Sequence, residues 1–400
     1  MQNTAKMIVL VREYDETSDK RAVEELERQC EVGSGGKMSL TTDHMGDPVC
    51  RVRHTPLYTM LVAELRDTKE IVGVIRGSLK TVTRGKKLLN DCPDYVKVAY
   101  ILGLRVSHAH RRLGIGMKLV EELEEWCKQN GAEYAYMATD YSNTASINLF
   151  TLKCAYDKFR TPTVLVHPVH AHYKSLGSGV KILKLNTKLA ESIYGGIFTN
   201  YEFFPKDIGV LLSNKLNLGT FMAVPYLSEW GQLEGQGHPY LPPSFAILSI
   251  WNTKEVFKLQ VKGVSPLIYA CCAGSRVIDT WLPILKIPSV PNVFKPFGVY
   301  FLYGLYMNGK GGAELLKSLC AFAHNMGRDD TGCGAVVAEV GQCDPARVGV
   351  PHWKSFSWAE DIWCMKKLIT SENQDEGSSV TDWIKSRPST SIIFVDPRDF

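Results

Sequence analysis

Residues 96–131 read VKVAYILGLRVSHAHRRLGIGMKLVEELEEWCKQNG, and they decide the fold. The first part is an apolar run over residues 98–106, which predicts a buried strand. After a loop, Leu119, Leu123 and Cys127 recur at helical spacing while lysines and glutamates cover the opposite side, which predicts an amphipathic helix. This helix ends at Gly131, because glycine adopts the left-handed conformation at a helix C-terminus without steric cost. The stretch is therefore a strand, a loop and a helix in direct succession.

The loop has the composition of an anion-binding turn. Arg111 opens it, and Gly114 and Gly116 let backbone N–H groups approach a ligand at the positive end of the helix dipole. An ATP-binding P-loop is excluded because no Lys-Ser or Lys-Thr pair follows the glycines. A dinucleotide-binding fingerprint is excluded because its third glycine and its acidic residue after the next strand are missing. The loop therefore predicts a pyrophosphate carried by another kind of ligand.

The elements around this stretch complete a recognisable order. A strand at 8–12 and a helix precede a hairpin of residues 58–65 and 70–79, and a strand at 134–139, a helix at 145–153 and strands over 156–166 follow. This order, with the Arg-x-x-Gly-x-Gly loop, resembles the GNAT superfamily of N-acetyltransferases. The resemblance implies an α/β fold on a mixed (α+β) sheet, with acetyl-CoA as co-substrate.

The second half of the chain repeats the pattern. A strand at 299–306, a Gly-rich loop at 308–312 and a helix over 315–323 mirror the opening stretch, and residues 252–255 nearly repeat the turn at 67–70. A repeat of this length predicts tandem GNAT-like domains rather than a solenoid. The second loop is shorter and lacks the arginine, so we expect a degenerate copy that is structural or binds a partner. The expected organisation is an acetyl-CoA-binding domain at 1–168, a linker at 169–179 and the degenerate domain at 180–400.

The bulk composition excludes several classes of protein. The net charge is +4 and no long block of Lys or Arg occurs, which disfavours direct nucleic-acid binding. The N-terminal apolar run is too short for a signal peptide, and no apolar segment approaches the length of a membrane span. Eleven cysteines without a Cys-x-x-Cys pair are typical of reduced thiols. We therefore expect a cytosolic or nuclear protein that is not secreted and has no membrane partner.

The resemblance assigns the cofactor site to particular residues. Gly103 predicts a bulge that separates neighbouring strands, beyond which the strand end offers backbone groups to the pantetheine arm. The N–H groups of residues 112–117 hold the pyrophosphate, and the two loop arginines add charge. A segment beginning at residue 143 resembles the superfamily's second CoA-contacting segment. The predicted acetyl-CoA-binding residues are Leu104, Arg105, Val106, Arg111, Arg112, Leu113, Gly114, Ile115, Gly116, Met117 and Asn143.

The catalytic groups are less well defined. An amine must lose a proton before it attacks a thioester, so transfer requires a base. Tyr100, Tyr136 and Asp140, on the predicted strands or just beyond them, are our candidate catalytic residues, and His108 and His110 in the loop are alternatives. For each residue alone, an ordinary structural role is equally open.

Two further absences affect the chemistry. The tyrosine that protonates the leaving thiolate in many relatives is Phe150 or Thr151 in this sequence, and Cys154 is a weaker candidate for the proton donor. Histidines 167, 170 and 172 have a loose metal-ligand spacing but no carboxylate or cysteine beside them. The transfer reaction also requires no metal, so none is expected.

A narrower resemblance extends over nearly the whole chain. The runs VREYD at 11–15, LNLGTF at 216–221, PHWK at 351–354 and FVDPRDF at 394–400 are similar to those of the HOOKLESS-type N-acetyltransferases of plants. One departure is Ala155, where that family has glycine. The resemblance implies a nuclear plant protein that acts in ethylene- and auxin-dependent growth and acetylates histones or other protein lysines.

Three hypotheses for the function follow. The first is an acetyl-CoA-dependent N-acetyltransferase that acts on a protein amine by direct transfer in a ternary complex. The second is a catalytically weak or inactive scaffold that acts through CoA binding or protein contacts, which the missing tyrosine acid favours. The third is a small-molecule acetyltransferase, for which an acidic pocket would indicate a polyamine and an apolar pocket an arylalkylamine. A homo-oligomer is left open.

Overall fold

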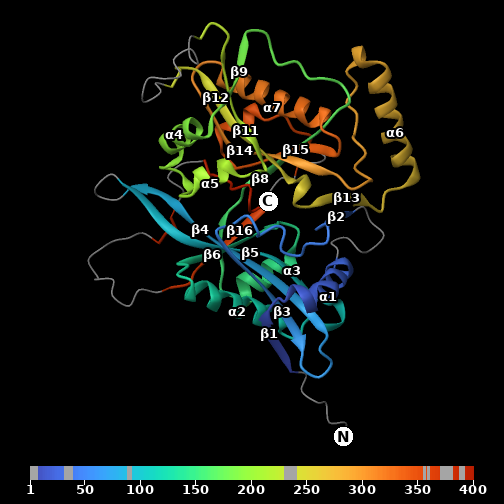
Figure 1. The fold of residues 1–400 in the computed structure, drawn as a ribbon, viewed down its shortest axis with the longest axis vertical. Coiled ribbons are helices and arrows are strands. Elements are labelled where there is room, and N and C mark those ends of the chain that lie inside the picture. The colour runs from blue at the N-terminus through green and yellow to red at the C-terminus, as the bar shows by residue number, and fades with distance from the viewer. Residues whose placement is uncertain are drawn as a thin grey trace.

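The computed structural model describes residues 8–30, 39–87, 92–228, 241–354, 357, 361–369, 382–386 and 392–400. They form two lobes that lie one above the other in Figure 1. We call the lobe with the larger sheet the N-lobe and the lobe with the six-stranded sheet the C-lobe. Within the described residues, no helix is long and apolar enough to cross a membrane.

The N-lobe is built on a mixed sheet; among its strand pairs in the described residues, β5 (Pro93–Val106) and β6 (Tyr134–Asp140) run parallel and the others antiparallel. Helices α1 (Glu16–Gln29) and α2 (Ile115–Gln129) pack on opposite faces of this sheet. Alternate side chains of β3 point to the two faces, and one set joins the hydrophobic cluster of α1 while the other joins that of α2. A short helix α3 (Thr144–Asn148) follows β6. In spatial order the strands are β1 (Val9–Glu13), β3 (Leu57–Leu65), β4 (Ile71–Lys87), β5 (Pro93–Val106), β6 (Tyr134–Asp140), β16 (Asp361–Lys367) and β7 (Asp157–Arg160), and β10 (Glu202–Pro205) pairs with β4.

The C-lobe repeats this architecture. Its parallel pair is formed by β14 and β15, and α7 (Gly312–Asp329) connects them as α2 connects β5 and β6. Helices α4 (Thr187–Phe198), α5 (Ile208–Ser213) and α6 (Pro266–Trp281) complete the lobe. The strands, in spatial order, are β8 (Thr163–Pro168), β15 (Cys333–Val340), β14 (Gly298–Asn308), β12 (Phe245–Asn252), β11 (Asn217–Pro225) and β9 (Val180–Leu185). The predicted mixed sheet and its repetition in the second half are confirmed.

The two lobes exchange a strand. Strand β8 lies in the C-lobe sheet, antiparallel to β15, and β16 lies in the N-lobe sheet between β6 and β7. The expected domains at 1–168 and 180–400 therefore do not coincide with the two sheets. A period-2 pattern identifies a strand but not its partner, so the exchange leaves no local signal in the sequence.

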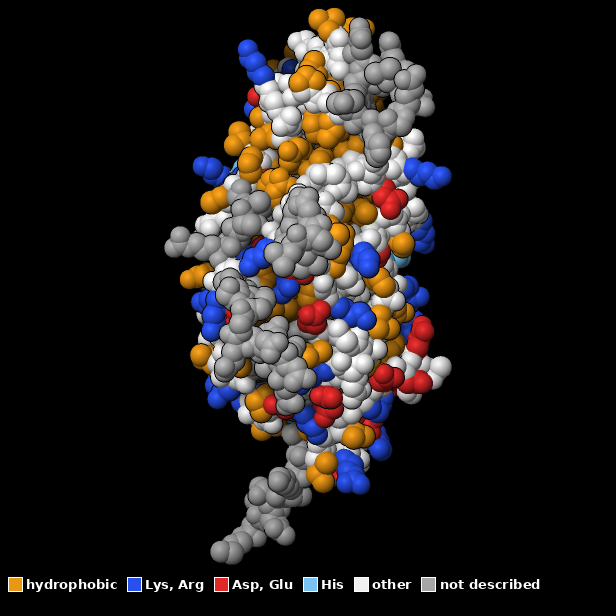
Figure 2. Space-filling model, turned by 90° about the vertical axis from the view of Figure 1, so that its left-hand side faces the viewer, with side chains coloured by type: hydrophobic (Ala, Val, Ile, Leu, Met, Phe, Trp, Pro, Cys, Tyr) orange, Lys and Arg blue, Asp and Glu red, His pale blue; other side chains and the backbone are white. Residues whose placement is uncertain are grey.

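One hydrophobic core continues from lobe to lobe. It contains aromatic side chains from both sheets and from the C-terminal segment, and a two-stranded sheet of β2 (Ser39–Asp43) and β13 (Lys258–Lys262) adds a further bridge. On the face shown in Figure 2, hydrophobic side chains gather over the upper half, which is the C-lobe, and charged side chains are more numerous below. The lobes are thus one folded unit with surfaces of different character.

Candidate functional site

The parallel strands of the N-lobe separate at a defined point. Their last paired residues are Ile101 and Met137. Just beyond, Gly103 has φ +65°, and the register between β4 and β5 shifts, so a bulge lies at this point. We call the gap between β5 and β6 beyond their last paired residues the notch. Residues 102–106 of β5 remain paired with β4 on one side only. The other edge offers backbone donors and acceptors to an extended ligand.

The N-terminus of α2 provides the predicted anion cradle. Gly114 lies in the left-handed region with φ +82°, and the first backbone bond after it runs from Lys118 N to Gly114 O at 3.0 Å. The N–H groups of residues 115–117 therefore have no acceptor within the helix. A Cβ at Gly114 would meet no atom within 4 Å, so the space in front of the cradle is open.

The structure brings the predicted cofactor residues to one region. A Cβ at Gly116 would lie 3.4 Å from Leu149, 3.8 Å from Val106 and 3.9 Å from Leu104, so the helix start packs against the free end of β5. Asn143 caps α3 by accepting from Ser146 N at 3.2 Å. The structural role of Asn143 is thus established, whereas its contact with a cofactor stays a prediction.

The predicted catalytic tyrosines lie elsewhere. Tyr100 and Tyr136 are buried between the lobes with ring centroids 4.9 Å apart, and Tyr136 donates to Asp399 Oδ2 at 2.6 Å. Burial raises the pKa of both phenols, and the Asp399 carboxylate raises that of Tyr136 further. Each phenol therefore keeps its proton near neutral pH, which gives a role as general base no support.

The third predicted catalytic residue, Asp140, ends β6. Its carboxylate accepts from Ser142 N at 2.7 Å, which forms a local turn before α3. Phe150 carries no hydroxyl, and the hydroxyl of Thr151, the other position considered for the proton donor, donates to Ile147 O at 2.8 Å. Nearby Tyr156 is buried with a raised pKa, first because of burial and then because of Glu124. These positions supply no evident proton donor.

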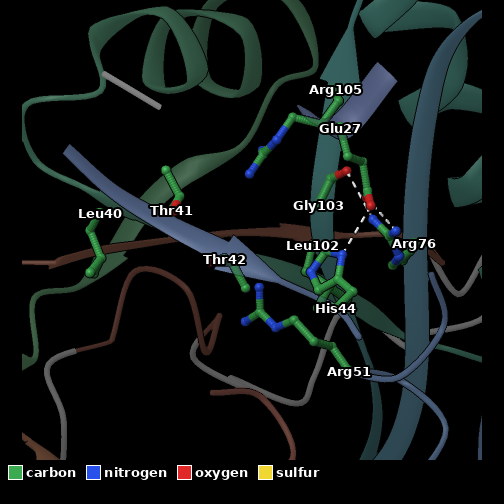
Figure 3. Close-up of a pocket in the computed structure, with 10 residues that line it drawn as sticks. All are labelled: Glu27, Leu40, Thr41, Thr42, His44, Arg51, Arg76, Leu102, Gly103 and Arg105. Carbon is green, nitrogen blue, oxygen red and sulfur yellow. Dashed lines mark hydrogen bonds and ion pairs between the residues drawn. The ribbon is translucent and has the colours of Figure 1, made fainter. Parts of the chain in front are cut away.

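A polar pocket opens beside the bulge in β5 (Figure 3). Its volume is about 70 Å³. Gly103 and Arg105 of β5 form one wall, and since side chains alternate along a strand, Arg105 points to the face opposite Leu104 and Val106. The remaining lining residues are Glu27, Leu40, Thr41, Thr42, His44, Arg51, Arg76 and Leu102. The pocket thus lies next to the free edge of β5, on the side of the sheet that α1 covers.

A carboxylate and an imidazole are paired in this pocket. His44 Nδ1 lies 2.9 Å from Glu27 Oε2, and Arg76 binds the other oxygen of the same carboxylate (Figure 3). Burial of Glu27 acts to raise its pKa, but the His44 hydrogen bond and the Arg76 charge prevail and lower it to about 2. Glu27 is therefore a carboxylate that orients His44 as a carboxylate orients the base in hydrolase triads.

The pocket is otherwise positively charged. Arg51 donates to the backbone oxygen of Asp399 at 3.3 Å, and Arg105 donates to Leu104 O at 3.0 Å. Burial lowers the pKa of Arg105, yet a guanidinium keeps its proton in proteins. These guanidiniums lower the proton affinity of an amine that enters the pocket and favour an oxyanion that forms there.

Sequence reasoning missed this group. Glu27 comes from α1, His44 from the segment after β2, and Arg76 from β4, so no spacing connects them. An arginine within a strand and a single histidine after a strand are both common, so neither pattern predicts a functional site. Only the fold reveals their association.

The equivalent notch of the C-lobe is filled. Strands β14 and β15 are last paired at Leu302 and Ala338, and Gly304, with φ +61°, takes the place of Gly103. The C-terminal segment, with Phe394 buried at its centre, leaves a cavity of only about 10 Å³ beside Gly304. The chain itself thus occupies the position where the N-lobe is open.

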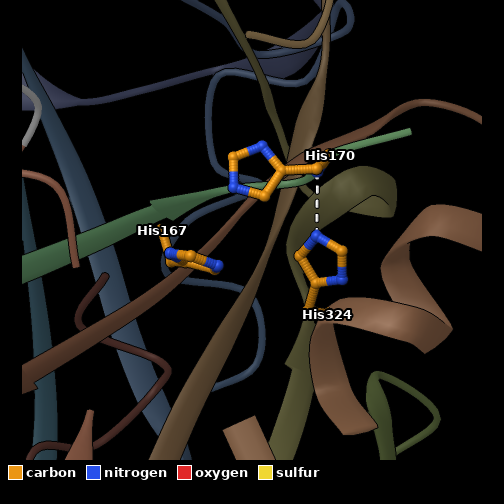
Figure 4. Close-up of side chains that lie close together, drawn as sticks. All are labelled: His167, His170 and His324. Carbon is orange, nitrogen blue, oxygen red and sulfur yellow. Dashed lines mark hydrogen bonds between the residues drawn. The ribbon is translucent and has the colours of Figure 1, made fainter. Parts of the chain in front are cut away.

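Histidines 167, 170 and 324 form a cluster whose ligand atoms lie within 4.8 Å of one another (Figure 4). His324 Nε2 accepts from the backbone N of His170 at 2.8 Å, and its Nδ1 lies 3.2 Å from Asn325 Oδ1. Both nitrogens of His324 are therefore engaged, so the cluster fits a metal ion poorly. Burial lowers the pKa of these imidazoles, to about 3 for His167 and about 4 for the other two.

Comparison with known proteins shows the family to which the chain is related. Residues 21–156 match a family model described as the acetyltransferase (GNAT) family. The chain is 52% identical to Probable N-acetyltransferase HLS1 of Arabidopsis thaliana, over 98% of this chain and 100% of that protein. It is 50% identical to the HLS1-like protein of the same plant, over 98% and 100%. An acetyl transferase of Oryza sativa subsp. japonica is 42% identical over 99% and 98%.

Solved structures share the two-lobed fold. Saccharomyces cerevisiae N-myristoyltransferase with bound myristoyl-CoA matches 92% of this chain and 81% of its own with a TM-score of 0.55 at 10% identity. A GCN5-related glucosamine N-acetyltransferase region of a fungal enzyme matches 90% of this chain and 38% of its own, with a TM-score of 0.54 at 14% identity. At these identities the match concerns the fold alone.

Proposed function

This chain belongs to the GNAT family of N-acetyltransferases, and from that premise we propose that it transfers the acetyl group of acetyl-CoA to lysine side chains of a protein. The observation that carries the proposal is the free edge of β5, which leads at Gly103 into the polar pocket that holds Glu27 and His44. The acyl donor and the base would thus meet at one point of the N-lobe.

The N-lobe fits acetyl-CoA at both ends. The free edge of β5 over residues 104–106 would pair with the pantetheine arm, and the N–H groups at the start of α2 would hold the pyrophosphate, with Arg111 and Arg112 exposed beside it. The open space at Gly114 supports this placement. The filled notch of the C-lobe supports a structural or partner-binding role for that lobe.

The polar pocket would receive the acceptor amine. A lysine amine is mostly protonated at neutral pH, so His44, oriented by Glu27, would take its proton. The amine nitrogen then forms a bond to the acetyl carbon, the carbon–sulfur bond breaks and CoA leaves as the thiolate. Arg51 and Arg105 would stabilise the oxyanion of the intermediate.

A scaffold that binds acetyl-CoA without transfer is the second candidate. It is favoured by one observation: the tyrosine that serves as proton donor in many relatives is replaced by Phe150 or Thr151 in this chain. The hydrophobic surface of the C-lobe in Figure 2 would then serve protein contacts, including self-association. A polyamine acetyltransferase fits less well, because the polar pocket carries three arginines and one acidic side chain.

The resemblance to the plant proteins extends the proposal to the cell. We place the protein in the nucleus, with histone-like lysines as acceptors and a role in ethylene- and auxin-dependent growth. A fluorescent fusion tests the location. Exclusion from the nucleus would contradict this part of the proposal without affecting the chemistry.

Acetyl-CoA titration and turnover on lysine peptides test the function. Gly114→Trp should abolish saturable binding, because the indole fills the space in front of the cradle. Gly311→Trp is the matched control: Gly311 precedes α7 with φ +79° and likewise has no atom within 4 Å of an added Cβ. Binding without transfer to any amine supports the scaffold, and no binding to the unmodified protein refutes both candidates.

A further inference from the structure

A second cavity lies beside the polar pocket, and almost all of its lining is hydrocarbon. Its volume is about 320 Å³, within the range of small-molecule and side-chain binding sites. The walls come from β13, β15, α6 and the segment before β14, with Val261, Val293, Phe294, Phe297 and Val337 among them. We call this cavity the apolar pocket.

The two pockets meet at β2 and at the C-terminus. Leu40 of β2 lines both cavities. The last residue, Phe400, lines the apolar pocket with its ring centroid 4.5 Å from that of Phe301, and the backbone oxygen of Asp399 before it accepts from Arg51 of the polar pocket. The same short segments therefore border both cavities.

Helix α6 forms the outer wall of the apolar pocket. Ile268 and Cys272 line the cavity, and Ile268 is also 50% accessible to solvent, while the neighbouring Leu267, outside the lining, is 74% accessible. The helix lies at the margin of the C-lobe (Figure 1). Its inner side is held by Arg276, which donates to Val290 O at 3.1 Å, and by buried Asp279. An extended ligand could therefore enter the pocket from the surface beside α6.

We propose that the apolar pocket binds a bulky aliphatic side chain of the acceptor polypeptide, a few residues from the lysine that is acetylated in the polar pocket. This inference rests on the proposed function and specifies its substrate: a peptide that carries leucine or isoleucine near the acceptor lysine. The observations behind it are that Leu40 lines both cavities and that the described residues lining the apolar pocket include no charged side chain, so that pocket suits an apolar group of the acceptor and not a second amine.

The acyl chain of a longer acyl-CoA is the competing occupant. An acyl chain that entered from the free edge of β5 through the polar pocket would pass Arg51 and Arg105, which line that pocket. Burying methylenes against guanidiniums loses the hydrophobic gain that would hold the chain. A side chain of the acceptor avoids this path because a polypeptide can cross the surface at β2 and α6.

Peptide kinetics on the full-length protein test the inference. Lysine peptides with one leucine scanned through the neighbouring positions are compared with all-alanine versions, and at one spacing leucine should lower KM about tenfold. Ile268→Glu places a carboxylate in the pocket wall and should remove that preference without changing kcat, the KM for acetyl-CoA or the KM for the alanine peptide. Leu267→Glu, on the same helix but outside the pocket, should keep the preference.

The outcomes separate this inference from the function. The apolar pocket is not an acceptor subsite if leucine lowers KM at none of the spacings. The same conclusion follows if Ile268→Glu and Leu267→Glu change the leucine preference equally. It also follows if the Ile268→Glu effect is seen with decanoyl-CoA instead of with peptides. If no peptide is acetylated at all, the proposed function fails, and fluorescence anisotropy of labelled peptides then tests whether the apolar pocket binds the leucine side chain. Leucine-dependent binding that is lost in Ile268→Glu supports the pocket as a binding site. Equal binding of the leucine and alanine peptides overturns it.

Discussion

In the reaction that we propose, transfer in the polar pocket depends on His44. It is the one imidazole among the described residues that line the pocket, and its Nδ1 lies 2.9 Å from Glu27 Oε2. That hydrogen bond leaves the other ring nitrogen, Nε2, for the amine proton. Glu27 in turn is fixed by Arg76, so the base has a defined orientation before a substrate binds.

Replacing His44 should therefore affect chemistry and not cofactor binding. His44→Gln is expected to lower kcat about 100-fold, the usual contribution of a general base, with little change in the Kd for acetyl-CoA. Steady-state kinetics and calorimetric titration measure the two quantities. His108→Gln removes the exposed rival histidine near the loop and should change kcat little. The reverse result, a loss with His108→Gln alone, would move the base to the loop.

Burial between the lobes changes the pKa of the Glu339 carboxyl on β15. This carboxyl accepts from Trp363 Nε1 at 3.1 Å, and burial, followed by the charge of Asp361, raises its pKa to about 8. A carboxyl in the unfolded chain titrates near pH 4.5. Between these values the unfolded state holds fewer protons at this site, so the contribution of Glu339 to stability falls as pH rises from about 4.5 to about 8.

Glu339→Gln removes that titration and keeps an oxygen for Trp363. The variant should be more stable than the unmodified protein at pH 8, by on the order of 1–2 kcal/mol, and close to it at pH 5. Denaturant titrations at the two pH values measure the difference. A stabilisation that is equal at both pH values would show that the carboxyl is not protonated in the folded state.

The strand, loop and helix predicted for residues 96–131 are confirmed as local structure, whereas the binding of acetyl-CoA by these residues stays a prediction. The strand end, loop and helix start that form the cradle are contiguous, and their glycines have a single physical explanation. Glu27, His44 and Arg76 could not be predicted, because three separate elements bring them together. Tyr100 and Tyr136 were placed on the correct strands, but strand alternation cannot show that the C-lobe covers the face on which they lie.

At the scale of elements, the bulge in β5 connects the notch with the polar pocket. Gly103 has φ +65°, and an added Cβ would lie 2.6 Å from Arg76 Nη1. Arg76 has little room to move, because its side chain is 2% accessible and its Nε donates to Pro48 O at 2.5 Å. The bulge therefore positions the arginine that fixes Glu27.

Gly103→Ala should disturb both functions of the bulge. Backbone strain and the displaced Arg76 together are expected to cost about 2–3 kcal/mol of folding free energy and to lower kcat, because Glu27 loses its partner. Gly179→Ala is a matched control with φ +81° and no atom within 4 Å of the added Cβ, so it should cost only about 1 kcal/mol. Equal losses in the two variants would refute the role of Arg76.

In the C-lobe, the glycine that corresponds to Gly103 is Gly304 of β14, and it packs against an aromatic core. A Cβ at Gly304 would lie 2.7 Å from the Tyr194 hydroxyl, which is hydrogen-bonded to Ser249, and Phe394 packs 6.3–6.4 Å from the rings of Tyr303 and Tyr194. An aromatic core thus occupies the notch that the N-lobe leaves free. The repeat was visible in the sequence, but its filling by the last residues of the chain was not.

At the scale of the whole molecule, the strand exchange makes the lobes interdependent. Strand β16 completes the N-lobe sheet between β6 and β7, and buried ion pairs tie the segments together. Arg160 of β7 binds Glu202 of β10 at 2.7 Å, and Lys80 of β4 binds Asp399 near the C-terminus at 2.5 Å. Breaking such a buried pair leaves an uncompensated charge, so separating the halves carries a large cost.

Residues 1–168, which contain the entire matched family region, should therefore not fold alone. Without β16 the β6 and β7 edges lose their partner, and the face that carries Tyr100 and Tyr136 loses its cover. Circular dichroism and size-exclusion chromatography should show an unfolded or aggregated fragment, whereas co-expression with residues 169–400 should yield a soluble complex that binds acetyl-CoA. A fragment that unfolds cooperatively and binds acetyl-CoA by itself would mean that the exchanged strand contributes little, and that the N-lobe is an independent domain as the sequence suggested.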